Sequence, residues 1–225
     1  MQNQKDTIDA LFKVGTHFGY SKTRRHSSAK KFIFGTKNKV DIIDLEKTYV
    51  MLEDAKKVMH DLKAGGKIIL FVGTKPEARE IIRSTASSLG MPYVADRWVG
   101  GLLTNFPEVK KRIAYFEDIR TKKEKGELDM FTKKERLLIE KDLERMTHNF
   151  GGVANIKRVP DAMFVVDPKK EHIAVTEALK SGIPVVAIAN TDCNLKAVNF
   201  PIIANDGSRG SIEYIVNTLK EALID

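Results

Sequence analysis

Five short apolar segments dominate the hydrophobic pattern of the chain, and three of them are apolar at nearly every position. These three are KIILFV at 67–72, DAMFVVD at 161–167 and IPVVAIA at 183–189. A half-buried strand alternates apolar and polar side chains, whereas a continuously apolar strand is typically buried on both faces. MPYVA at 91–95 and FPIIA at 200–204 resemble shorter versions of the same pattern. The pattern therefore predicts a sheet that is covered on both sides.

Segments with helical periodicity alternate with these predicted strands. They span 76–89, about 170–180 and about 208–223. Alternating strands and helices with buried strands are typical of a parallel sheet between two helical layers, so we predict a three-layer α/β/α sandwich. VDIIDL at 40–45 predicts a further strand, and an amphipathic helix is predicted at 46–62. We expect both to extend the same sheet.

One long segment, from 108 to about 150, does not fit this scheme because it is strongly charged with sparse apolar positions. The apolar spacings of three, four, and six or seven residues suit a narrow helical seam, and a break is expected at Lys125–Glu127. We predict two antiparallel helices, a coiled-coil hairpin that projects from the sandwich. Its seam residues are Val109, Ile113, Phe116, Leu137, Leu143, Met146 and Phe150.

The length and composition favour one large folded domain with an insertion. The chain has 225 residues, of which 42% are hydrophobic, enough for a substantial core. We divide it into a basic segment with a first strand at 1–45, a sandwich formed by 46–107 and 150–225, and the inserted hairpin at 108–149. No apolar run is long enough for a membrane span, and the first residues lack the apolar core of a secretory signal. A single cysteine fits a reducing cytosol.

The charge is concentrated in one place. The net charge is +8, and residues 20–39 alone contribute seven Lys and Arg side chains without an acidic residue. Between Asp9 and Asp41 no acidic side chain interrupts them. Solvated charge runs usually mix signs, so this segment favours a polyanionic partner over a merely soluble loop.

The residues around these cations favour RNA as the polyanion. His17, Phe18, Tyr20 and His26 are interleaved with the charges, and flat rings can stack on bases or sugars. The chain contains no helix-turn-helix, zinc-finger or basic-zipper pattern that would place a helix in the major groove of DNA.

An enzymatic alternative rests on the loop after the first buried strand. VGTKPEAR at 72–79 follows a strand and opens a helix, so a phosphate at that helix end is the second hypothesis. The glycine spacings of a P-loop and of a dinucleotide turn are both absent. The simpler interpretation is that Gly73 permits a turn, Thr74 caps the helix and Lys75 is exposed.

Other catalytic and metal-binding patterns are missing. The five histidines are scattered without metal-ligand spacing, and Cys193 has no CxxC partner, so we predict no metal or cofactor. Asp192 and Asp206 follow predicted strands, where such residues line a cleft or, more often, form turns and caps.

Six sequence motifs, which occur in the order found in the family, closely resemble the bacterial ribosomal protein S2 family. They cover most of the chain: GTHFGY (15–20), FIFGTKNKVDIIDLEKT (32–48), LFVGTK (70–75), RWVGGLLTNF (97–106), GGVANIKRVPDAMFVVDPKKEHIAVTEA (151–178) and GIPVVAIANTDCN (182–194).

This resemblance implies a flavodoxin-like sandwich with a projecting helical hairpin and a structural, non-enzymatic role in the cytoplasm. It implies binding to the RNA of the small ribosomal subunit late in assembly, next to other small-subunit proteins, and help in holding ribosomal protein S1. A membrane or a small-molecule substrate is not expected. The loop after Arg25 departs from the family pattern, because His26–Lys30 replaces the usual Trp-Asn-Pro-Lys-Met run.

We assign RNA contacts from the charge cluster together with the motifs that match the family. Trp98 has two open roles, stacking on RNA or pinning its loop to the core, and Gly100 and Gly101 are expected to supply unusual backbone angles or close approach. The predicted RNA-binding residues are Lys22, Arg24, Arg25, His26, Lys30, Lys31, Lys37, Lys39, Arg97, Trp98, Lys110, Lys111, Arg112, Lys157 and Arg158.

Overall fold

A five-stranded parallel sheet forms the centre of the computed structural model, which describes residues 2–224. Its spatial order is β5-β4-β6-β7-β8, and each neighbouring pair is parallel. Counted along the chain this order is 2-1-3-4-5, the flavodoxin-like order of doubly wound sheets. The predicted fold class is therefore confirmed. The strands are β4 (Ile69–Val72), β5 (Tyr93–Val94), β6 (Ala162–Val166), β7 (Val185–Ala189) and β8 (Phe200–Ile203).

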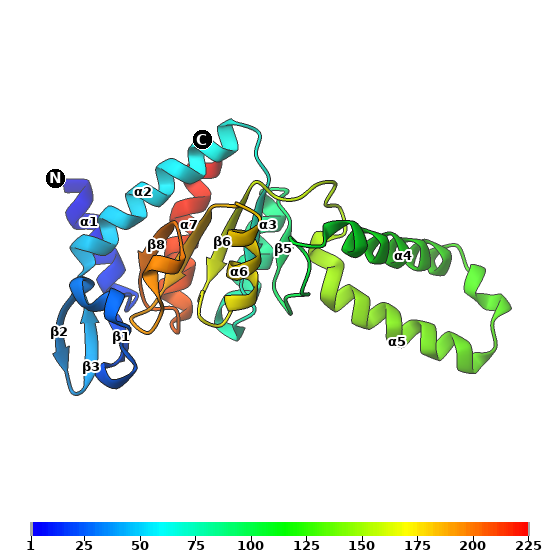
Figure 1. Cartoon of the computed structure of the whole chain (residues 1–225), viewed down its shortest axis with the longest axis horizontal. Coiled ribbons are helices and arrows are strands. Elements are labelled where there is room, and N and C mark those ends of the chain that lie inside the picture. Colours follow the sequence, from blue (N-terminus) through cyan, green and yellow to red (C-terminus); the bar gives the residue numbers. More distant parts are fainter. Residues whose placement is uncertain (1, 225) are drawn as a thin grey trace.

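Helices cover both faces of this sheet (Figure 1). Successive strand side chains point to opposite faces: Phe71 and Phe164 lie in one buried apolar cluster, while Leu70 and Met163 lie in the other. The first cluster is completed by α2 (Leu45–Ala64), α3 (Pro76–Ser88) and α7 (Arg209–Ile224), and the second by α6 (His172–Lys180) and the hairpin root. This arrangement is the expected three-layer sandwich.

The N-terminal part forms a second, antiparallel sheet, which corrects the expectation that residues 40–45 extend the parallel one. The order is β1-β3-β2, and β2 pairs with β3 through a tight turn in which Asn38 and Lys39 have φ of 51° and 65°. Such a turn folds a strand back on its neighbour and so favours antiparallel pairing. The elements are α1 (Gln2–Lys13), which the pattern did not predict, β1 (Phe18–Ser21), η1 (Lys22–Arg24), η2 (Ser27–Phe32), β2 (Ile33–Lys37) and β3 (Val40–Ile43).

The charged insertion forms two antiparallel helices that extend away from the sandwich, at the opposite end of the molecule from the small sheet (Figure 1). Gly126, with φ of 73°, ends the first helix, and a capping box between Thr132 and Glu135 begins the second. Near the root Ile113 is buried, whereas Leu137 near the tip is half exposed. The elements are α4 (Phe106–Glu124), η3 (Glu127–Met130), α5 (Lys133–Phe150) and η4 (Gly151–Val153).

Within residues 2–224, no helix is both long and apolar enough to cross a membrane.

Candidate nucleic-acid interface

The N-terminal segment covers the end of the parallel sheet where doubly wound folds usually bind ligands. The backbone N–H groups of Tyr20 and His26 donate to the hydroxyl and carbonyl oxygens of Thr191, which follows β7, at 2.9 and 2.8 Å. Ala29 and Ile43 pack against Cys193 in a third buried apolar cluster. The chain therefore fills this crevice with its own residues.

Gly19 in the HFGY motif lies close to the loop after β7. A Cβ atom there would lie 2.7 Å from Cγ2 of Thr191 and 3.0 Å from the backbone oxygen of Asp41. Real Cβ atoms do not come so close to other heavy atoms, so only glycine allows β1 to lie against the loop after β7.

Lys75 lies in a polar cluster beneath this segment, where we expected an exposed side chain. Its ammonium group lies 3.0 Å from Asp167, 2.9 Å from Asp206 and 3.3 Å from the Tyr20 hydroxyl. Burial opposes the charge, but the two carboxylates outweigh it and raise the pKa of Lys75. The prediction of an exposed Lys75 is wrong because the carboxylates that neutralise it are distant in sequence.

Thr74 does not cap the following helix, which corrects a second expectation. Its hydroxyl donates to the buried carboxylate of Glu171 instead, and Lys75 occupies the N-cap position without a side-chain capping bond to the helix. The Lys75 ammonium group and the Thr74 hydroxyl are thus both bound to other groups of the protein.

Two aspartates of the polar cluster have opposite pKa shifts. Burial and the neighbouring charge of Asp167 raise the pKa of Asp206 to about 6. Burial also acts on Asp167, but the N–H of Lys170 and the ammonium of Lys75 lower its pKa overall. Asn190 donates to Asp206 at 2.8 Å, so the cluster is well satisfied by hydrogen bonds.

Burial raises the pKa of Cys193 to about 12, so this lone thiol is protonated and unreactive. Among residues 4–224, no group of three or more His, Cys, Asp and Glu side chains is placed to hold a metal ion.

Arg25 is held by the protein. Its guanidinium forms a two-pronged ion pair with the fully buried Asp41 on β3, and only 18% of its side chain is exposed. Hydrogen bonding from Arg25 lowers the pKa of Asp41 despite burial. The acidic counter-charge that residues 20–39 lack is supplied by the next strand, so Arg25 mainly positions the small sheet.

Arg24 remains partly available at the surface. It contacts Asp192 at 3.3 Å and lies over the Tyr20 ring, and 55% of its side chain is exposed. Lys169 shares the same aspartate at 2.8 Å.

The remaining cations of the N-terminal segment form a free basic surface, which we call the N-terminal basic surface. The side chains of Lys22, Lys30, Lys37 and Lys39 are exposed and have no hydrogen-bond or ion-pair partner among residues 4–224. Lys31 lies over the Phe32 ring at 4.8 Å. Phosphate groups can therefore reach these lysines without breaking a contact within the protein.

A cavity of about 770 Å³ opens on this surface. His26 lines it but also caps η2, accepting from the N–H of Ser28. Lys30 and Lys31 meet Lys196 there, and Lys196 was not among the predicted residues. Sequence reasoning missed it because it lies 165 residues after Lys31, in the short 3-10 helix η5 (Leu195–Ala197), which has no charge cluster.

Exposed rings accompany the lysines. Phe12 stacks on His17 at 4.4 Å between ring centres, and His17 lies 4.1 Å from Phe18. Phe34 on the edge strand β2 is 82% exposed. Burial lowers the pKa of His17, which favours its neutral form in this stack.

Glu177 on α6 organises the loop that contains the RWVGG motif at 97–101. This buried carboxylate accepts from the indole N–H of Trp98 at 3.1 Å and from the N–H of Gly101 at 2.8 Å, and it also accepts from Leu103 and Thr104. Of the two roles open to Trp98, the geometry gives it that of pinning the loop. Gly101 has φ of 89°, the unusual backbone angle expected for it.

The predicted residues at the hairpin root lie apart from the N-terminal basic surface, beyond the opposite edge of the sheet (Figure 1). Arg97 and Arg112 have no side-chain partner within residues 4–224. Lys111 pairs with Glu108 at 2.7 Å, and Arg158 pairs with Asp161 at 2.8 Å. The side chain of Lys110 donates to the backbone oxygen of Lys157 at 3.4 Å, so these two residues lie close together.

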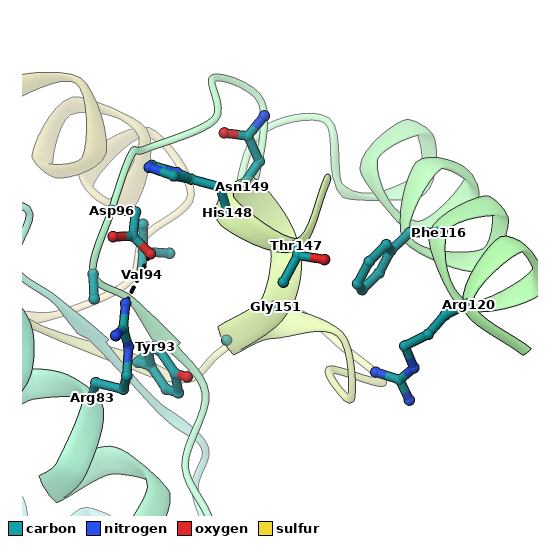
Figure 2. A pocket seen from close by; sticks show the side chains of 12 residues that line it. Arg83, Tyr93, Val94, Asp96, Phe116, Arg120, Thr147, His148, Asn149 and Gly151 are labelled. Atoms are coloured by element: carbon teal, nitrogen blue, oxygen red, sulfur yellow. Dashed lines mark hydrogen bonds and ion pairs between the residues drawn. The ribbon is translucent and has the colours of Figure 1, made fainter. Parts of the chain in front are cut away.

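A cavity of about 450 Å³ lies where the hairpin joins β5 (Figure 2). Its arginines already have partners: Arg83 lies 3.0 Å from Asp96, and Arg120 lies 3.0 Å from Glu117. Gly152 lets the backbone pass close to Tyr93, since a Cβ atom at position 152 would lie 2.3 Å from the backbone oxygen of Tyr93. This cavity is a structural junction between the hairpin and the sheet.

Comparison with known proteins gives a consistent result. The family model of ribosomal protein S2 matches residues 11–225. The chain is 42% identical to the small ribosomal subunit protein uS2 of Sulfurimonas denitrificans, over 96% of this chain and 84% of that protein. It is also 42% identical to uS2 of Chloroherpeton thalassium, over 97% of this chain and 87% of that protein.

The relative from Coprothermobacter proteolyticus, also a uS2 protein, is 40% identical over 97% of this chain and 82% of its own length. All these relatives are named as ribosomal proteins and not as enzymes. The sandwich, the projecting hairpin and the six sequence motifs agree with this match, and the chain belongs to the ribosomal protein S2 family.

Proposed function

We propose that this chain is a structural constituent of the small ribosomal subunit that binds small-subunit ribosomal RNA in the cytoplasm. The observation that carries the proposal is the N-terminal basic surface, where exposed, unpaired lysines belong to the same segment as the exposed rings of Phe18 and Phe34. Unpaired lysines suit contact with phosphates, and exposed rings suit unstacked bases. Family membership supports the same role.

The proposed roles divide along the chain. Residues 1–45 contact RNA, 46–107 and 150–225 form the supporting sandwich, and 108–149 form the hairpin that reaches neighbouring components. The half-exposed apolar side chains of Leu137 and Leu138 on α5 suit contact with a protein. We propose that the chain joins late in assembly, contacts other small-subunit proteins and helps to dock ribosomal protein S1.

An enzymatic role has less support. The loop after Val72 would have to release Lys75 from two carboxylates before it could bind a phosphate. The N-terminal segment would also have to leave the sheet end, where Gly19 lies against Thr191. The filled crevice therefore argues against a nucleotide site there.

The salt dependence of binding to the cognate small-subunit ribosomal RNA tests the proposed RNA contacts. We expect Lys30→Ala with Lys37→Ala to weaken binding and to reduce the slope of log affinity against log salt by about 1.4–1.8, since each lost phosphate contact removes about 0.7–0.9. Lys57→Ala with Lys180→Ala removes two exposed lysines elsewhere and serves as the matched control. Equal slopes for both double variants would contradict the proposal.

A further inference from the structure

A second cavity at the hairpin root, of about 530 Å³, differs chemically from the junction in Figure 2. It is lined by Arg97 and Trp98 from the loop after β5, by Arg112 and Tyr115 from α4, and by Arg145 and Met146 from α5. Three arginines from three elements therefore surround one hollow. Its volume is in the range of small-ligand sites.

Two of these arginines are unusual within this protein. Most of its arginines bind an acidic side chain or a backbone oxygen, as Arg83 and Arg120 do in the neighbouring cavity. Arg97 and Arg112 have no such partner among residues 4–224, although they line the same cavity. A guanidinium fork binds phosphate in a bidentate manner, so a pair of unpaired forks around one hollow suits a phosphate group.

The third arginine is only partly engaged. Arg145 contacts Asp142, its neighbour on α5, at 3.0 Å, and 70% of its side chain remains exposed. The nearby carboxylate of Glu177 does not line the cavity, and its oxygens accept hydrogen bonds from the Trp98 loop. The cavity thus keeps a positive lining.

Aromatic and apolar side chains complete the lining. Tyr115 is 55% exposed, and Met146, which also lines the cavity, is half-buried. The indole of Trp98 is fixed by its bond to Glu177 and so forms a rigid wall. A flat ring can lie against tyrosine and methionine only when it is unstacked, as bases are in single-stranded RNA.

We propose that this cavity binds one nucleotide of a single-stranded stretch of RNA, with its phosphate on Arg97 and Arg112 and its base against Tyr115. The inference rests on the proposed RNA-binding function and gives it a second contact, separate from the N-terminal basic surface. A nucleotide monophosphate is the chemical unit that fits, and the RNA strand is its source.

Trp98 provides a direct measurement, because it is the only tryptophan in the chain. The full-length protein is titrated with a labelled ten-nucleotide single-stranded oligouridylate, with the same strand paired to oligoadenylate, and with UMP. Anisotropy of the label reports binding, and Trp98 emission reports entry into the cavity. We expect the single strand to change the emission at lower concentration than the duplex or UMP.

Variants locate the contact. Arg97→Ala with Arg112→Ala should weaken single-strand binding by about tenfold or more, and should reduce the salt slope by about 0.7 because one phosphate contact is lost. Tyr115→Ala should weaken it by about fivefold or more, while Tyr115→Phe keeps the ring and should bind normally. Arg209→Ala removes another exposed, unpaired arginine at the opposite edge of the sheet and should have little effect.

Several outcomes would overturn the inference. Binding that leaves Trp98 emission unchanged, or a double variant that binds like Arg209→Ala, would show that the cavity is not used. A response to UMP but not to the single strand would assign the cavity to a free nucleotide. If the ribosomal RNA still responds to loss of Lys30 and Lys37, only this inference fails and the proposed function stands.

Discussion

Lys75 lies between Asp167 and Asp206 at the end of the parallel sheet, below the Tyr20 hydroxyl. One ammonium group faces two carboxylates, so the cluster would hold a net negative charge if both were ionised. The raised pKa of Asp206, about 6, relieves this excess by keeping a proton at mildly acidic pH. The polar cluster therefore makes stability depend on pH.

We expect Asp206 to contribute a term to the free energy of unfolding that decreases as pH rises from about 4 to about 6. The carboxyl of Asp206 holds its proton up to about pH 6 in the folded state but loses it near pH 4 when unfolded. Its stabilising term is thus complete below pH 4, is lost as pH rises through about 6, and then stays constant.

Asp206→Asn removes this titration, so the difference in stability between wild type and variant should change by on the order of 3 kcal/mol across that range. Urea unfolding at pH 4, 5, 6 and 7 measures it, with the exposed Asp54→Asn as control. A difference that is the same at every pH would contradict this account of the cluster.

Gly19→Ala should loosen the N-terminal segment, because its methyl group would lie 2.7 Å from Cγ2 of Thr191. Forced overpacking of this kind typically costs about 1–3 kcal/mol. Gly35→Ala on β2 is the matched control, since no heavy atom lies within 4 Å of its Cβ position. Urea unfolding compares the two, and equal stabilities would show that β1 does not need its close approach.

At the scale of elements, the loop between β5 and α4 owes its shape to one side chain of another element. Glu177 on α6 accepts hydrogen bonds from Trp98, Gly101, Leu103 and Thr104. Burial alone would raise the pKa of Glu177, but these donors lower it overall. The Glu177 carboxylate stays ionised and holds the loop with the RWVGG motif in place.

Glu177→Gln should destabilise the protein by about 2 kcal/mol, because the amide NH₂ of glutamine faces donors that then lack an acceptor. Trp98 should also become more exposed to water, which would shift its emission to longer wavelength. Glu144→Gln on the exposed face of α5 controls for the loss of charge. Unchanged emission with unchanged stability would mean that the loop is held by other contacts.

The sequence predicted the elements that are buried on both faces. The runs that contain β4, β6 and β7 are apolar throughout, because helices cover them on both sides. The small antiparallel sheet was not predicted, since its strands are four or five residues long and only partly buried. The turn at Asn38 lacks the glycine that usually marks such a hairpin.

At the scale of the whole molecule, the small antiparallel sheet and the hairpin lie at opposite ends of the sandwich (Figure 1). The sequence located the charge correctly but could not show which cations are free. Arg25 is neutralised by Asp41 and Arg24 is shared with Asp192, and both partners are brought close only by folding. Lys196 joins the surface for the same reason.

The hairpin root is similar. Its six predicted cations share a region, but Lys111 and Arg158 are paired while Arg97 and Arg112 have no side-chain partner among residues 4–224. Linear patterns give charge and periodicity, whereas ion pairing depends on contacts between distant elements. The RNA contacts at both ends therefore remain predictions.

Sedimentation of cell lysate through a sucrose gradient, followed by detection of this chain, tests the central proposal most directly. The account predicts that the chain sediments with the small ribosomal subunit at physiological salt, and that Lys30→Ala with Lys37→Ala releases it at lower salt than Lys57→Ala with Lys180→Ala does. Recovery of the wild-type chain only among free soluble proteins, at low and physiological salt alike, would contradict the account.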